Sequence, residues 1–78
     1  MVEGLSQKLK ELRRTMGWTQ EDLARKLLVS LSTVERWERG RPVGSLASQR
    51  ALARLFRKAH MVRERAKREL EREEGEQD

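Results

Sequence analysis

The residues with the clearest chemical capacity lie between Ser30 and Gly40. In the stretch LSTVERWERG, Arg36 and Arg39 alternate with glutamates around a single tryptophan, Trp37. A guanidinium group donates paired hydrogen bonds that match the O6 and N7 atoms of guanine, and it also binds phosphate oxygens. Solvated surface charges are the plainer reading of the same arginines, so the elements that position them must be worked out first.

Composition favours a polyanionic partner. The 78-residue chain carries 18 Lys and Arg against 13 Asp and Glu, a formal net charge of +5. The excess lies in residues 1–62, with a charge of +7, whereas residues 63–78 carry −2. A basic body attracts nucleic acid first and an anionic membrane surface second. A helical protein with a mixed-charge surface is the alternative that composition leaves open.

Residue usage argues against catalysis and against bound cofactors. The chain has no cysteine, so disulfides, thiolate metal sites and thiol nucleophiles are excluded. His60 is the only histidine and has no ligand cluster around it, so we interpret it as a helix-surface residue. Without a glycine-rich phosphate loop or paired carboxylates, we predict no enzyme, no cofactor and no metal. No apolar run has the length of a membrane span or of a signal peptide, so we expect a cytoplasmic protein.

Apolar periodicity predicts an all-α chain. A stripe at spacings of three and four predicts a first helix over residues 6–16 with Gly17 as its left-handed terminator; the stripe consists of Val2, Leu5, Leu9, Leu12 and Met16. Thr19 and Asp22 have the spacing of a capping box, which predicts a second helix that ends near Leu27. Ser30 is the N-cap of a third helix over residues 31–39.

A fourth helix is predicted to follow Ser45, with an inner face formed by Leu46, Leu52, Leu55 and Phe56. Residues 51–74 fit either one long helix or two helices with a bend near residues 57–60, and the last four residues are expected to fray. Glu and Arg at spacings of three and four, Glu64 with Arg68 and Glu69 with Arg72, support this helix locally. Beyond the core the seam thins, which fits either a solvated extension or a dimerisation helix with a face of Phe56, Ala59, Val62 and Ala66.

The link between the second and third helices is only about three residues long, which forces the two helices to cross, as in a helix-turn-helix. Ala24 lies where they approach closest, and Val34 and Trp37 share the inner face of the third helix. We interpret Trp37 as a core residue in preference to a base-stacking one.

The segment TQEDLARKLLVSLSTVERWERGRP resembles the helix-turn-helix of the Cro/repressor (Xre-type) DNA-binding regulators, and the resemblance extends over about residues 6–56. It implies a compact, all-α, four- to five-helix lambda-repressor-like domain over residues 1–58. The helix-turn-helix itself would span about residues 20–39, with residues 59–78 as a C-terminal helical extension. In this family the third helix enters the major groove of DNA.

The resemblance also implies a structural ion pair between Arg13 and Glu38, with two exposed charges as the alternative. One position departs from the family pattern. The first turn residue is usually a glycine with positive φ, but here it is Leu28. A leucine in this conformation costs on the order of 1 kcal/mol, so the turn is either strained or rearranged.

Carried over residue by residue, the family pattern assigns base reading to Leu31, Ser32, Glu35 and Arg36, with Glu35 at the flank. Arg36 is the strongest candidate because it can bind guanine. Phosphate contacts are assigned to Gln20, Ser30, Thr33, Arg39 and Arg41.

These features predict a sequence-specific, double-stranded DNA-binding transcription regulator, most simply a repressor, that acts in the cytoplasm at the nucleoid. We expect a homodimer on a pseudo-palindromic operator with half-sites about 34–36 Å apart. A restriction-modification controller and an antitoxin share this fold, and an antitoxin would bind a protein partner through the C-terminal helix. The rival class is an interaction module that binds protein or RNA. A membrane-surface helix is disfavoured because the apolar seam is thin.

Overall fold

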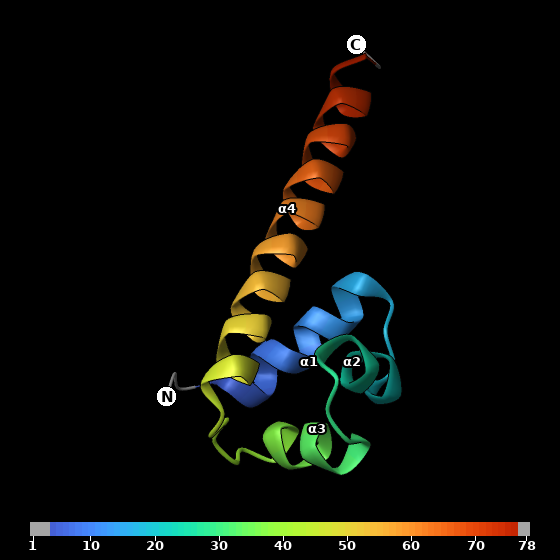
Figure 1. Ribbon diagram of the computed structural model, residues 1–78. Helices are drawn as coiled ribbons and strands as arrows, with labels where there is room; N and C mark the ends of the chain where they lie inside the picture. The colour runs from blue at the N-terminus through green and yellow to red at the C-terminus, as the bar shows by residue number, and fades with distance from the viewer. Residues whose placement is uncertain (1–3, 77–78) are drawn as a thin grey trace.

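The computed structural model describes residues 4–76, which form four helices and no strand (Figure 1). Their bounds are α1 Leu5–Met16, α2 Gln20–Leu27, α3 Leu31–Glu38 and α4 Leu46–Glu76. Helices α1, α2 and α3 gather around the first half of α4, and the second half of α4 projects away from them. The described part of the chain is therefore elongated, with extents of 50 × 22 × 20 Å. The all-α prediction is confirmed, and α4 is one continuous helix with no bend into two. Val2, predicted to begin the apolar stripe, lies outside the described residues.

The core lies where all four helices meet. Each of α1, α2 and α3 contributes its predicted inner face, and α4 adds residues from its first half. The buried members are Leu9, Leu12, Leu23, Ala24, Leu27, Val34, Trp37, Val43, Leu52 and Ala59. Trp37 is only 5% exposed, so it is a core residue and is not available to stack on a base.

Two positions differ from the expected core. Leu46 was expected to face inward but is 59% exposed, because it is the first residue of α4 and lies before the helix reaches the other three. Val43, which precedes α4 and is not part of the predicted inner faces, is buried. Gln49 stabilises this connection by donating a hydrogen bond of 2.8 Å from Nε2 to the carbonyl oxygen of Val43. The backbone before α4 is thereby held against the core.

The helix starts follow the capping residues that the sequence supplies. Thr19 and Asp22 form a reciprocal capping box, with hydrogen bonds of 2.9 and 3.0 Å between side chain and backbone. Ser30 Oγ accepts the Thr33 N–H at 3.2 Å, and Ser45 Oγ accepts the Ser48 N–H at 3.3 Å. Each side chain satisfies a backbone donor that has no partner inside its helix.

The first three helices end with the same pair of backbone hydrogen bonds, the Schellman motif. At each end, a residue in the left-handed region lets two N–H groups reach back to carbonyls of the last turn. This residue is Gly17 after α1, Leu28 after α2 and Gly40 after α3, with φ of 71°, 57° and 98°. The turn before α3 is therefore regular but strained, because Leu28 has a Cβ atom and the two glycines do not.

Relief of this strain is expected to stabilise the protein. Leu28 is 92% exposed, so removal of its side chain sacrifices no packing. We expect Leu28→Gly to raise the free energy of unfolding by about 0.5–1 kcal/mol, because the strain it relieves exceeds the entropic cost of glycine. Urea denaturation measures the change. Leu28→Ala, which keeps the strain, is the control and should match wild type; equal stability of the two variants would contradict the argument.

The projecting half of α4 differs from expectation in two respects. The helix continues through Gly75 to Glu76, so it does not fray at Gly75, and residues 77 and 78 lie outside the described range. Neither Glu64–Arg68 nor Glu69–Arg72 is among the ion pairs formed in the part of the chain that the structure describes. Every residue from 65 to 75 is exposed. Of the helices described, none is both long and apolar enough to cross a membrane.

Candidate nucleic-acid interface

The outer face of α3 brings together the residues predicted to read bases. The opposite side of α3 packs inward and carries the three buried residues of the helix, Val34, Trp37 and Glu38. At 3.6 residues per turn, the outward positions span an arc of about 140°; they are Leu31, Ser32, Glu35, Arg36 and Arg39. Glu35 is half-buried and the other four are exposed. An eight-residue helix with one buried and one open face has the shape needed to enter a groove.

Arg36 lies against the hydroxyl groups at the start of α3. Its Nη2 donates to Thr33 Oγ1 at 3.3 Å, and Thr33 Oγ1 lies 2.8 Å from Ser30 Oγ. This contact uses one of the five donors of the guanidinium group, so the others are free to bind a nucleic acid. Ser30 accepts the Thr33 N–H as the N-cap, and its O–H group can still donate. The three residues thus form one polar corner at the beginning of the helix.

Arg39 and Arg41 lie at the other end of α3, and both are exposed. Arg39 Nη2 lies 3.6 Å from Glu35 Oε2 in an ion pair, and the Arg39 side chain is 73% exposed. Such a long and solvated pair contributes little free energy. Arg39 can therefore leave Glu35 for a phosphate at small cost.

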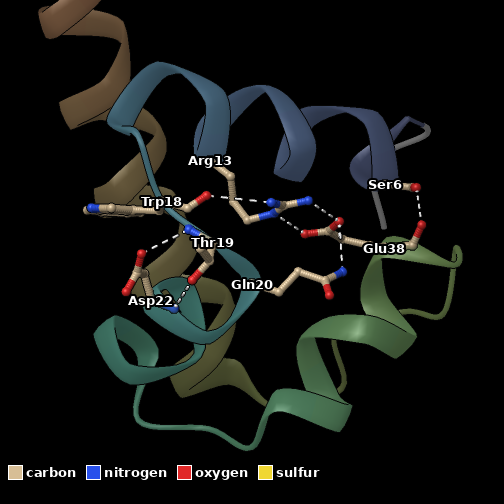
Figure 2. Close-up of polar contacts among 7 residues, drawn as sticks. All are labelled: Ser6, Arg13, Trp18, Thr19, Gln20, Asp22 and Glu38. Carbon is tan, nitrogen blue, oxygen red and sulfur yellow. Dashed lines mark hydrogen bonds and ion pairs between the residues drawn. The ribbon is translucent and has the colours of Figure 1, made fainter.

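The end of α3 is anchored to α1 and α2 through the carboxylate of Glu38 (Figure 2). Arg13 binds it as a fork, with Nε 2.7 Å from Oε2 and Nη2 2.9 Å from Oε1. Gln20 Nε2 donates to the same Oε1 at 3.2 Å. Ser6 Oγ donates to the backbone oxygen of Glu38, and Arg13 Nη1 lies 3.5 Å from the Trp18 carbonyl oxygen. The position of α3 is therefore fixed by a hydrogen-bonded carboxylate.

Glu38 is ionised in this setting. Burial raises the pKa of Glu38, but the hydrogen bonds from Arg13 and Gln20 and the charges of Arg13 and Lys10 outweigh it and hold the pKa below its ordinary value. The hydrogen bond to Glu38 in turn raises the pKa of Arg13 above its ordinary value. The Glu38 side chain is 4% exposed and that of Arg13 is 24% exposed, so this is a mostly buried pair.

Gln20 occupies a position between this network and the surface. One N–H of its side-chain amide is directed at Glu38, and an amide has a second N–H. An open hollow of about 310 Å³ lies beside it, lined by Lys10, Gln20, Glu35, Glu38 and Arg39. The second donor of Gln20 therefore faces an open space that is lined by two cations and two carboxylates.

Lys10 is a member of this hollow that sequence reasoning missed. It lies three residues before Arg13, so the two share a face of α1. Once Arg13 is paired with the end of α3, Lys10 must lie close to the same helix. The spacing already indicated that Lys10 and Arg13 share a face of α1. Only the pairing of Arg13 with Glu38 shows that this face lies against α3.

A family comparison agrees with this geometry. Residues 5–66 match the family model of the helix-turn-helix domain, which is well over half of the chain. The chain belongs to the helix-turn-helix domain family. The match confirms the family predicted from the sequence and is consistent with the Cro/repressor (Xre-type) resemblance. Neither the curated proteins nor the solved structures compared with this helix-turn-helix protein give a match.

The predicted dimerisation residues of this helix-turn-helix protein separate into two groups. Ala59 is 1% exposed within the core, and Phe56 is partly buried against it. Both line a groove between α4 and α1. Val62 and Ala66 lie farther along α4 and are exposed. In one molecule the first half of the predicted face therefore packs against α1, and its second half is exposed; the dimerisation role of the face stays a prediction.

Proposed function

We propose that this helix-turn-helix protein is a sequence-specific double-stranded DNA-binding regulator, most simply a repressor that occupies promoter DNA. In this proposal α3 lies in the major groove, and two copies bind the half-sites of a pseudo-palindromic operator. The observation that carries the proposal is the open face of α3, because a short helix anchored by a buried carboxylate presents Leu31, Ser32 and Arg36 without obstruction.

The charges around this face support the proposal. Lys10 and Arg39 line one hollow beside α3, and Arg41 follows the end of the helix, so all three lie where a phosphate backbone that borders the groove would pass. Gln20, Ser30 and Thr33 add neutral donors that fix the register on the duplex. In the proposed complex Arg36 binds a guanine through O6 and N7, and Leu31 contacts a thymine methyl group. No catalytic residue is assigned.

The first test is a selection from random duplex DNA at about 150 mM salt, followed by affinity measurements on the selected sequence. For Arg36→Ala we expect a loss of about 1–3 kcal/mol per half-site for the selected duplex, with little change on scrambled DNA. Arg36→Lys is the matched control because it keeps the charge and removes only the planar fork. It should lose nearly as much specificity.

Two outcomes would contradict the proposal. One is equal binding of wild type and Arg36→Ala to every duplex, and the other is the absence of any enriched sequence with binding that disappears in salt. Either result would leave only a basic surface and would favour an interaction module of the antitoxin type, which binds a protein or RNA partner.

A further inference from the structure

No other described helix lies beside the projecting half of α4 (Figure 1), and this half carries a seam of exposed apolar residues. Met61 is 60% exposed, Val62 40% and Leu70 58%, and Ala66 lies between them. An open hollow of about 440 Å³ runs along the same side of the helix, lined by Lys58, Met61, Val62, Arg65, Ala66 and Glu69. Val62, Ala66 and Leu70 are spaced at four residues and continue the face that Leu52 and Ala59 bury lower in α4.

The charges that accompany this seam change sign along the helix. Basic side chains flank its first part, and acidic side chains predominate beside its last part; the charged side chains within about 120° of the seam are Lys58, Arg63, Arg65 and Lys67, followed by Glu69, Arg72, Glu73 and Glu74. This order is unfavourable for α4 alone, because the C-terminal end of a helix dipole is stabilised by cations and destabilised by anions. The pairs Glu64–Arg68 and Glu69–Arg72 within the helix are not formed either. No ion pair in the described part of one molecule accounts for this charge pattern.

We propose that a second copy of this chain covers the seam, with its α4 antiparallel to the first and Ala66 near the two-fold axis. In that arrangement the acidic end of each helix lies beside the basic stretch of its partner. A parallel pair would instead place like charges side by side over the whole seam. Ala66 is the smallest residue of the seam, so the two helices approach each other most closely there.

This inference deepens the dimeric part of the proposed function, and its test uses no DNA. Because the chain has no cysteine, single cysteines report on neighbours without interference. With Ala66 near the axis, residue 62 of one copy lies opposite residue 70 of the other. Val62→Cys and Leu70→Cys are therefore prepared separately, oxidised alone and as an equal mixture, and read by intact mass. Ala66→Cys is oxidised alone.

The antiparallel arrangement predicts that the mixture gives mainly the disulfide between the two different variants. Each of these variants alone should give little product, whereas Ala66→Cys should pair with itself, since a disulfide requires Cα atoms within about 7 Å. Arg68→Cys, on the other side of the helix, is the control for random collision. Sedimentation equilibrium of the wild-type chain should show a dimer that weakens as salt is added.

Two results would overturn the inference. Efficient self-pairing of both Val62→Cys and Leu70→Cys would show a parallel pair. A monomeric wild type, with no cross-linking above the Arg68→Cys control, would show that the seam is not covered by a second copy. Specific DNA binding by a monomer would leave the proposed function standing without this interface.

Discussion

Arg13→Ala is expected to lower the free energy of unfolding by about 3 kcal/mol, which is a large part of the stability of a domain of this size. The loss comes from Glu38, whose side chain is 4% exposed and would keep its charge without the guanidinium that binds both oxygens. The figure lies at the lower end for buried pairs because the Arg13 side chain is 24% exposed and water can partly replace it. Urea denaturation measures the change.

The neighbouring arginine supplies the control. Arg14 lies in the same turn of α1, is exposed and forms none of the described ion pairs, so Arg14→Ala should change stability by less than about 0.5 kcal/mol. Glu38→Gln added to Arg13→Ala should recover part of the loss, because it removes the uncompensated charge. If Arg13→Ala lowered the free energy of unfolding as little as Arg14→Ala does, the Arg13–Glu38 pair would have no structural role.

The pH dependence of stability gives the same argument a second readout. The pKa of Glu38 in the folded protein lies below its ordinary value of 4.5, so its contribution is present above that pH and is lost as the pH falls through the lowered pKa. In Arg13→Ala, burial is no longer outweighed by Arg13, and the pKa of Glu38 should rise. Protonation of Glu38 at low pH then removes the uncompensated charge from the variant. The difference in the free energy of unfolding between wild type and Arg13→Ala should therefore shrink on acidification.

Local sequence signals were sufficient for the helices and their ends. Thr19 with Asp22, Ser30 and Ser45 each have a side-chain oxygen at the position where a helix start needs one. Gly17 and Gly40 supply the left-handed residue at two helix ends. At the third, the family pattern left Leu28 either strained or rearranged, and the structure has it in the left-handed region. The caps and the glycine ends depend on neighbours within six residues, which is why local spacing predicts them.

Contacts between distant segments could not be predicted in the same way. The spacing of Ala59 is equally suited to a dimer face and to a contact with α1, and only the crossing of α1 over α4 decides between them. Leu46 has the spacing of a core residue, but it lies in the part of α4 that precedes the contacts with the other helices, so it is exposed. Lys10 lies beside Gln20 because Arg13 pairs with Glu38, 25 positions away; the family resemblance implied this pair, but no local pattern contains it.

The proposed interface carries three cations per chain, Lys10, Arg39 and Arg41, placed to meet phosphates. A dimer would then neutralise about six phosphates, and each neutralised phosphate releases bound counterions from DNA. The logarithm of the affinity should therefore fall with the logarithm of the salt concentration with a slope of about −5. Between about 50 and 200 mM salt, the affinity should drop about 10³-fold.

A series of variants measures how much individual arginines contribute to this salt dependence. Arg41→Ala removes one phosphate contact per chain, so we expect the slope to become shallower by about 2 and the affinity for specific and scrambled duplexes to fall together. Arg57→Ala, which removes the same charge from an exposed position of α4, should leave the slope unchanged. Fluorescence anisotropy with labelled duplexes at five salt concentrations measures both. If Arg57→Ala made the slope as shallow as Arg41→Ala does, DNA affinity would depend only on the net charge of the chain. That result would contradict phosphate contacts located around α3.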